Sequence, residues 1–203
     1  MSLKGAIFDL DGTLIDTEPI YFSAAEKLIK EYGNGKEFGW DTKIKTLGSP
    51  EIVTAKIIVD TFDIKLTPEE FLNKRNALTP ESFKKCPFIE GAKEITDKFK
   101  KEWLKEDFDK IILGDDPRIK KGKPEPDIFI LAAKELNLTP QECIMFEDSI
   151  GGIKACINSG AKIVVGIPDP HLKDKVKDII YDKNVTKLII LDKIKDFDFS
   201  LIN

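Results

Sequence analysis

A short stretch near the start of the chain places two acidic residues directly after an apolar run. The run is Ala6-Ile7-Phe8, and the chain continues as Asp9-Leu10-Asp11-Gly12-Thr13-Leu14. In a buried strand, alternate side chains share a face, so Asp9 and Asp11 are expected to point the same way where the strand ends. Two acids held together in an apolar setting are costly unless a cation or a catalytic task balances them. An isolated Asp-x-Asp-Gly would otherwise indicate a plain turn.

Length and composition fit one ordinary domain, or a core domain with a small insert. The chain has 203 residues, of which 41% are hydrophobic and 33% charged, as in a globular rather than a disordered protein. Its net charge of −4 gives no general attraction to nucleic acid or to an anionic membrane. No signal peptide or membrane-spanning run is seen. We therefore expect a cytoplasmic protein with neither a nucleic-acid nor a membrane partner. A monomer is the default expectation, and the oligomeric state is left open.

The cysteine and histidine content excludes several kinds of site. The three cysteines, Cys86, Cys143 and Cys156, are widely spaced and odd in number, so they form neither a disulfide framework nor a Cys-x-x-Cys metal site. We expect them to be free thiols. His171 is the only histidine, which excludes a multi-histidine metal site and argues against a Ser-His-Asp triad.

Strand and helix patterns alternate along the chain. A buried strand over residues 5–10 is followed by a helical block, with strong helix starts at Ser49-Pro50-Glu51 and Thr67-Pro68-Glu69-Glu70. The elements expected after it are a helix from Gly91 to about Glu106, a strand over Phe108–Leu113, a helix over Pro126–Leu136, a strand over 143–146, a helix from Ser149 to Ser159, and strands over 162–167 and 187–191. This alternation predicts an α/β fold with a parallel sheet and helices on both faces.

Two further polar stretches lie where a parallel sheet of this kind binds ligands, beyond the carboxyl ends of strands. The first is Gly122-Lys123-Pro124-Glu125-Pro126, in which the flanking residues restrict the backbone of Lys123. The second is Glu147-Asp148-Ser149, followed by Gly151-Gly152. A lysine run alone usually marks a solvated surface, and two acids at a helix start simply suit the helix dipole.

Taken together, the three stretches resemble the motifs of the haloacid dehalogenase superfamily of phosphohydrolases. The stretch from Ala6 to Leu14 is similar to its first motif, the stretch around Lys123 to its lysine motif, and Glu147-Asp148 to its fourth motif. In detail the lysine stretch is most similar to the pseudouridine 5'-phosphatase branch, which lies close to the β-phosphoglucomutase-like proteins. The resemblance implies a Rossmann-like catalytic core over 1–15 and 86–203 and an inserted helical cap over 16–85.

The family resemblance also implies a division of roles among the acids. Asp9 would be the nucleophile that forms an aspartyl-phosphate. Mg²⁺ would be held by the other oxygen of Asp9, the backbone carbonyl of Asp11 and the carboxylate of Asp148, with Glu147 acting mainly through a metal-bound water. Asp11 would protonate the leaving alkoxide and then activate the hydrolytic water.

The remaining implied roles concern the phosphate. Because a phosphomonoester dianion repels any nucleophile, its charge must be neutralised first, and Lys123 would do this while holding Asp9. The free N–H groups around Gly12 and Thr13 would cradle the phosphate. Glu18, at the start of the cap, either points into the site or is an ordinary helix-start charge.

One piece of the family pattern is missing. Between the helix that begins at Gly91 and the strand expected at Phe108, the family has a further strand ending in Thr or Ser, its second motif, and about twenty residues are absent here. Thr96 lies mid-helix and is not assigned to that role. An unpaired edge in a buried sheet is expensive, so we expect the 108–113 strand to pair with the Asp9 strand in a sheet one strand short.

Three functions follow from these features. The first is a Mg²⁺-dependent phosphatase for a small phosphorylated metabolite, with pseudouridine 5'-phosphate as the first substrate suggested and glycerol phosphate and deoxysugar phosphates behind it. The second is a catalytically impaired or inactive truncated homologue, which the missing segment favours. The third is a phosphosugar mutase, because the same aspartate pair and helical cap serve that reaction as well.

Overall fold

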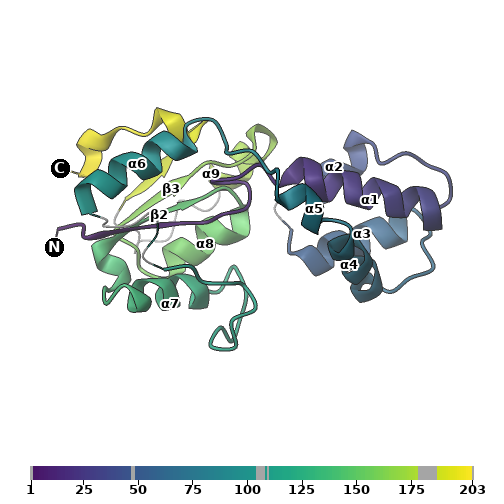
Figure 1. Ribbon diagram of the computed structural model, residues 1–203, viewed down its shortest axis with the longest axis horizontal. Coiled ribbons are helices and arrows are strands. Elements are labelled where there is room, and N and C mark those ends of the chain that lie inside the picture. The colour runs from purple at the N-terminus through teal and green to yellow at the C-terminus, as the bar shows by residue number, and fades with distance from the viewer. Residues whose placement is uncertain (1, 47–48, 104–107, 109, 178–186, 203) are drawn as a thin grey trace. The chain divides into compact units, whose positions relative to one another are not determined.

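The chain forms two compact units. The computed structural model describes residues 2–46, 49–103, 108, 110–177 and 187–202 (Figure 1). One unit, called the sheet unit here, consists of Met1–Ile15 and Phe88–Asn203, and the other, the helical unit, consists of Asp16–Pro87. The chain thus leaves the sheet unit directly after the first acidic stretch and returns to it seventy-two residues later.

The sheet unit contains a four-stranded parallel sheet. Its strands lie in the order β1 (Gly5–Phe8), β2 (Cys143–Glu147), β3 (Ile163–Gly166) and β4 (Leu188–Ile190). The predicted α/β class is therefore confirmed. Gly5 lies opposite Cys143 and Phe8 opposite Phe146, so the residues that follow β1 and β2 meet at the same edge of the sheet. This register brings the first and last acidic stretches together.

Helices cover both faces of the sheet, because alternate residues of each short strand are apolar on opposite sides. On one face, α7 (Asp127–Glu135) and α8 (Ile150–Asn158) pack on Ile7, Met145 and Val164. On the other face, α6 (Ala92–Trp103) and the C-terminal 3₁₀ turns pack on Ile144 and Phe146 (Figure 1). The remaining short helices of this unit are α9 (Lys173–Lys177) and the 3₁₀ turns Pro140–Glu142, Pro170–Leu172, Ile194–Asp196 and Phe199–Ile202.

The predicted strand over 108–113 is wrong. Within the part of it that the structure describes, residues 108 and 110–113, no strand forms, and Ile111 and Leu113 are 75% and 65% exposed. An apolar run becomes a strand only where a neighbouring strand and a buried face receive it, and here a turn at Gly114–Asp115 follows at once. The end predicted for the preceding helix, near Glu106, lies outside the described residues.

The pairing predicted between the 108–113 segment and the Asp9 strand is therefore also wrong. Among the described strands, β1 pairs with β2 alone and lies at an edge of the sheet. An edge strand offers unpaired backbone groups, and short length is one way in which proteins limit this cost. β1 has only four residues, which fits that solution.

The helical unit is a small bundle with its own core. Its helices are α1 (Glu18–Tyr32), α2 (Trp40–Thr46), α3 (Glu51–Thr61), α4 (Pro68–Ala77) and α5 (Pro80–Phe83). They bury apolar residues that include Leu28, Ile58 and Phe71. The start predicted for α4 is confirmed by a capping box, in which the Thr67 hydroxyl accepts from the Glu70 N–H and the Glu70 carboxylate accepts from the Thr67 N–H.

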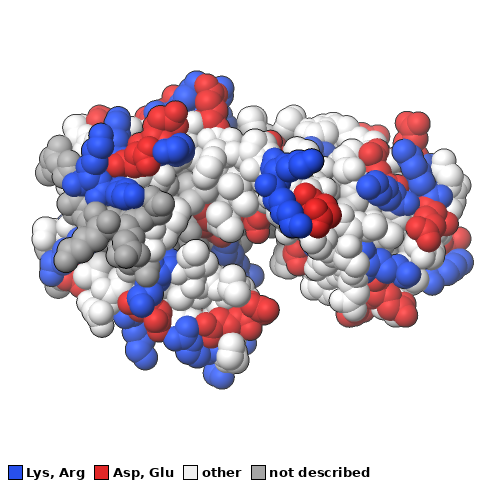
Figure 2. Space-filling view, viewed as in Figure 1, with Lys and Arg blue, Asp and Glu red and all other residues white. Residues whose placement is uncertain are grey.

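Charged side chains of both signs are interspersed on the face of the molecule drawn in Figure 2. Several form short-range ion pairs on single helices, such as Lys93 with Asp97 on α6. Within the described part of the chain, no helix combines the length and the apolar run that crossing a membrane takes.

Candidate active site

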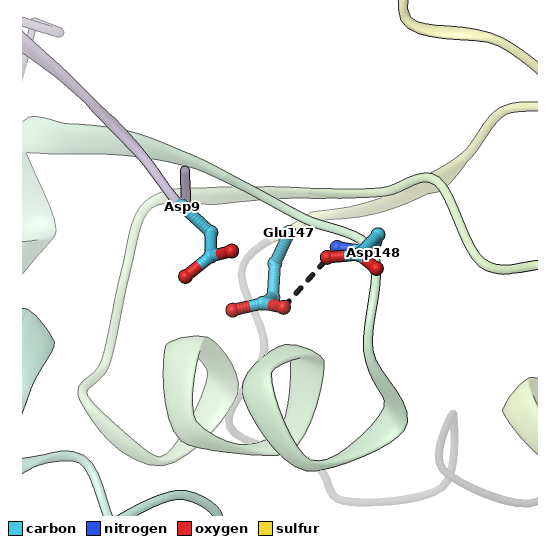
Figure 3. Close-up of side chains that lie close together, drawn as sticks. All are labelled: Asp9, Glu147 and Asp148. Atoms are coloured by element: carbon cyan, nitrogen blue, oxygen red, sulfur yellow. Dashed lines mark hydrogen bonds between the residues drawn. The ribbon is translucent and has the colours of Figure 1, made fainter. Parts of the chain in front are cut away.

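Three carboxylates meet at the carboxyl ends of β1 and β2. Asp9 directly follows β1, Glu147 is the last residue of β2, and Asp148 comes next (Figure 3). One oxygen from each of the three lies within 4.8 Å of the others. Since the two strands are parallel neighbours in register, their ends bring together acids that lie 138 and 139 residues apart in the chain. The sequence motifs thus form one site.

Lys123 supplies the positive charge of this site. Its Nζ donates to Asp9 Oδ1 and to Glu147 Oε2, both at 2.6 Å. The side chain is 26% exposed and also lies over the ring of Phe129, 5.4 Å from the ring centre. Lys123 of the lysine motif therefore contacts Asp9 of the first acidic stretch, as the family resemblance implies. The described residues of the segment 108–113, which precedes Lys123 in the chain, form no strand.

Both oxygens of Glu147 accept hydrogen bonds. It is fully buried; Oε2 accepts from Lys123, while Oε1 accepts from the backbone N–H groups of Asp148 and Ser149 and from the Ser149 hydroxyl. Glu147 therefore acts on its neighbours: it orients Lys123 toward Asp9 and fixes the turn that carries Asp148. No motif in the sequence predicts this pairing of Glu147 with Lys123, and the only local signal for it is the glycine that follows in α8.

That glycine is Gly152, which makes room for Glu147. A Cβ at position 152 would lie 1.9 Å from the Glu147 carboxyl carbon, whereas a Cβ at Gly151 would meet only the Lys123 Cβ, at 3.9 Å. We expect Gly152→Ala to lower the free energy of unfolding by roughly 2–4 kcal/mol, because the buried carboxylate has to move and lose its hydrogen bonds.

Gly151→Ala is the matched control on the same helix. It is expected to be neutral or to raise stability by up to about 1 kcal/mol, as alanine does in a helix. Urea unfolding of both variants measures the difference. Equal stability of the two would show that Glu147 does not need this space.

The turn after β1 holds Asp148 in place. The buried Thr13 hydroxyl donates to Asp148 Oδ1 at 3.1 Å, and Gly12 has φ +81°, with Asp148 Oδ2 only 2.4 Å from where a Cβ would lie. The N–H of Gly12 donates to the Ile15 carbonyl at 2.9 Å, and the role of the N–H groups around Gly12 and Thr13 toward phosphate stays a prediction. This hydrogen bond closes the short turn between Gly12 and Ile15. Asp11 is exposed, and its oxygens are not part of the acidic group of Figure 3.

Burial and mutual repulsion perturb the acids. Burial, followed by repulsion from Glu147, raises the pKa of Asp9 to about 6, although Lys123 counteracts this. Repulsion from the charge of Asp11 also raises the pKa of Asp9, as the smallest of these effects. Burial and the charges of Glu147 and Asp9 raise the pKa of Asp148 to about 8. Burial lowers the pKa of Lys123, but attraction to Glu147 and Asp9 outweighs it, so the net shift is upward. One lysine does not neutralise three acids.

This charge imbalance predicts how stability depends on pH without metal. A carboxyl whose pKa is raised in the folded state binds its proton more tightly there, so its contribution is complete below pH 4 and is lost as the pH rises through 8. We expect the free energy of unfolding without metal to fall between pH 5 and 8. Asp148→Asn should reduce this fall, and Asp97→Asn on the exposed face of α6 should not. Thermal unfolding at several pH values in EDTA tests this, and an unchanged pH profile for Asp148→Asn would contradict it.

Other singled-out residues are not members of the acidic group of Asp9, Glu147 and Asp148. Glu18 is the first residue of α1 in the helical unit, where its Oε1 pairs with Lys43 Nζ at 2.9 Å. Its predicted role toward phosphate stays a prediction. Cys143 and Cys156 are buried free thiols, Cys86 is a half-buried one, and the ring of His171 contacts the Asp169 carboxylate in an exposed 3₁₀ turn.

The fold is that of a haloacid dehalogenase-like hydrolase. Family patterns with that description match residues 6–105 and 87–160. A relative in Saccharomyces cerevisiae, a probable pseudouridine-5'-phosphatase, is 35% identical over 202 residues, covering 84% of this chain and 85% of its own length. The chain belongs to the haloacid dehalogenase-like hydrolases and is therefore an enzyme of that class.

Further relatives have related activities. A (DL)-glycerol-3-phosphatase of Arabidopsis thaliana is 30% identical, with 93% of this chain and 88% of that protein covered. Among solved structures, a family IA hydrolase from Entamoeba histolytica has a TM-score of 0.73 at 22% identity, covering 100% of this chain and 97% of that one. A β-phosphoglucomutase from Clostridium difficile also gives 0.73, at 21% identity, with 98% and 95% covered. These structural likenesses concern the fold alone.

Proposed function

We propose that this hydrolase is a Mg²⁺-dependent phosphatase acting on a small phosphomonoester through an aspartyl-phosphate on Asp9. The observation that carries the proposal is the contact of Lys123 Nζ with Asp9 Oδ1 at 2.6 Å, beside the Asp148 carboxylate. A carboxylate can approach a phosphate dianion only when negative charge is neutralised, and the Lys123 ammonium supplies part of that neutralisation while a metal ion held beside Asp148 would supply the rest.

The donor set fits Mg²⁺. All candidate ligands are hard carboxylate oxygens, which Mg²⁺ prefers, and the three acids carry more negative charge than Lys123 neutralises. Asp9 and Asp148 would hold the ion, joined by the Asp11 carbonyl that the family resemblance implies, and Glu147, which accepts from Lys123 and Ser149, would act mainly through a metal-bound water. When bound, the ion would neutralise charge on the phosphoryl oxygens.

The chain's own residues would divide the reaction into two steps. An oxygen of Asp9 attacks phosphorus, the bond from phosphorus to the substrate oxygen breaks, and Asp11 gives its proton to the departing alkoxide. Asp11 then takes a proton from water as that water attacks the aspartyl-phosphate, releasing inorganic phosphate and restoring Asp9. Lys123, oriented by Glu147, holds Asp9 and the transferring oxygens throughout. The helical unit would serve as the cap that excludes water, with residues 16–85 as its predicted extent.

The substrate proposal rests on the relatives. They include named phosphatases for pseudouridine 5'-phosphate and for glycerol 3-phosphate, so a phosphorylated nucleoside or polyol is proposed, with the nucleoside first. A catalytically impaired homologue is the second candidate, favoured by the position of β1 at the sheet edge where the family's second motif would otherwise lie.

Phosphate release from a panel of phosphomonoesters, with Mg²⁺ and with EDTA, tests the proposal. The panel contains pseudouridine 5'-phosphate, glycerol 3-phosphate and a deoxysugar phosphate. Metal-dependent turnover by the wild-type protein would support a phosphatase. No release from folded protein would favour the impaired homologue. Interconversion of glucose phosphate isomers without phosphate release would instead indicate a mutase.

A further inference from the structure

The loop that carries Lys123 is long, and yet it places one ammonium accurately. Residues 110–126 form only turns, bends and irregular backbone before α7 begins. Long connections of this kind have many conformations unless side chains fix them. Lys123 Nζ nevertheless lies 2.6 Å from both Asp9 Oδ1 and Glu147 Oε2. Because a lysine side chain is flexible, the backbone at Lys123 has to be held for these contacts to persist.

Asp127, the first residue of α7, anchors the part of the loop that precedes Lys123. Its Oδ2 accepts from the backbone N–H groups of Lys120 at 3.0 Å and of Lys121 at 3.1 Å. The helix that carries Asp127 is itself fixed to the sheet by the buried ring of Phe129. An acid at this position also suits the helix dipole, but the dipole does not explain why one oxygen accepts two N–H groups from the preceding loop. Asp127 thus attaches this loop to a rigid helix.

Asn158, the last residue of α8, anchors the part of the loop that follows Lys123. Its Nδ2 donates to the Pro124 carbonyl at 3.0 Å. Between the two anchors, the N–H of Glu125 donates to the Gly122 carbonyl at 3.1 Å and closes a turn around Lys123. Since α7 and α8 pack on the same face of the sheet, both anchors are fixed to one apolar core.

We propose that Asp127 and Asn158 are positioning residues that hold Lys123 against Asp9. Each acts through the backbone on one side of Lys123 rather than on the reacting atoms. Asp127 has the larger part, because its carboxylate accepts two charge-assisted hydrogen bonds, whereas the exposed Asn158 amide donates one neutral hydrogen bond. The inference rests on the proposed function for the task of Lys123, which is to neutralise phosphate charge beside Asp9.

The rate at which acetic anhydride modifies Lys123, followed by mass spectrometry of its peptides, tests the positioning without any catalysis. An ammonium held by two carboxylates has to leave them before it reacts, so Lys123 should react more slowly than Lys154, which is exposed on α8. Asp127→Ala should raise the ratio of the Lys123 rate to the Lys154 rate roughly tenfold, since two hydrogen bonds to a charged group are lost. Asp127→Asn keeps an oxygen that can accept both N–H groups, so it should restore most of the protection.

Asp115→Asn is the matched control, because it removes an acid from an exposed turn of the same loop. Its rate ratio should equal that of the wild type. Asn158→Ala should raise the ratio by a smaller factor than Asp127→Ala. An unchanged ratio in folded Asp127→Ala would overturn the proposal. If that variant did not fold, the surface variant Asn158→Ala would decide, and an unchanged ratio there would overturn the proposal.

The kcat and KM for phosphate release with saturating Mg²⁺ give the second readout. Asp127→Ala should lower kcat roughly ten- to a hundredfold with a smaller change in KM, because a displaced Lys123 fails mainly in the transition state. Asp127→Asn should recover most of this loss, and a wild-type kcat in Asp127→Ala would overturn the proposal. Protection of Lys123 that depends on Asp127, in a protein that hydrolyses no phosphomonoester, would support the positioning and reject the proposed function.

Discussion

Asp9→Asn is expected to lower the rate of phosphate release at least about a thousandfold, because an amide cannot form the acyl phosphate that a carboxylate forms. Stability should change little. The carboxyl is already driven toward its neutral form by burial and by Glu147, and the amide oxygen can still accept from Lys123. Steady-state phosphate release with saturating Mg²⁺ measures the effect.

The control for this experiment is Asp97→Asn, which removes an acid of the same kind from the exposed surface of α6, where it pairs only with Lys93 among the interactions described. This variant should retain the wild-type rate. If Asp9→Asn kept a tenth or more of the wild-type activity while folded, Asp9 would not be the nucleophile, and the covalent mechanism would be wrong.

Lys123→Met should remove both activity and a large part of the stability. Its ammonium is the only cation that contacts Glu147, which is 1% exposed, in the part of the chain that the structure describes. Leaving a buried carboxylate without its partner costs roughly 3–5 kcal/mol. We expect a loss of that size in urea unfolding, together with the loss of metal-dependent phosphate release.

A double variant separates stability from chemistry. Glu147→Gln in the Lys123→Met background removes the orphaned charge, so it should restore a measurable part of the stability but none of the activity. Lys121→Met, in the same loop and exposed, is the matched control and should change neither. If Lys123→Met were as stable as the Lys121→Met control, the buried ion pair would have no energetic importance.

The position of β1 at the edge of the sheet is expected to lower the rate of phosphate release. In this chain β1 lies at the edge of the sheet, and its only described strand neighbour is β2. A phosphate oxygen on that side of Asp9 would lack the hydroxyl and N–H that the family's second motif supplies, and one such donor is commonly worth a few kcal/mol in the transition state. The rates of the wild-type protein are therefore expected to be low for this class of enzyme.

Much of the site followed from local sequence. The apolar run before Asp9, the capping box at Thr67 and the cap at Ser149 depend on residues within a few positions of one another, and the structure has β1, α4 and α8 where these signals predicted them. The resemblance to the family motifs predicted which distant stretches lie together. Contact between distant stretches is a property of the fold and cannot be read from their spacing alone.

Tertiary structure decided what depends on neighbours far away in the chain. The segment 108–113 has strand-forming residues, yet without a partner strand and a buried face its described residues form none. For Glu147 the sequence predicted a role through a metal-bound water, and only the fold showed that its buried carboxylate also accepts from Lys123 and Ser149 and so positions both of them. Sequence by itself determined which groups were available for the chemistry; packing and charge balance determined which of them remain available to a ligand.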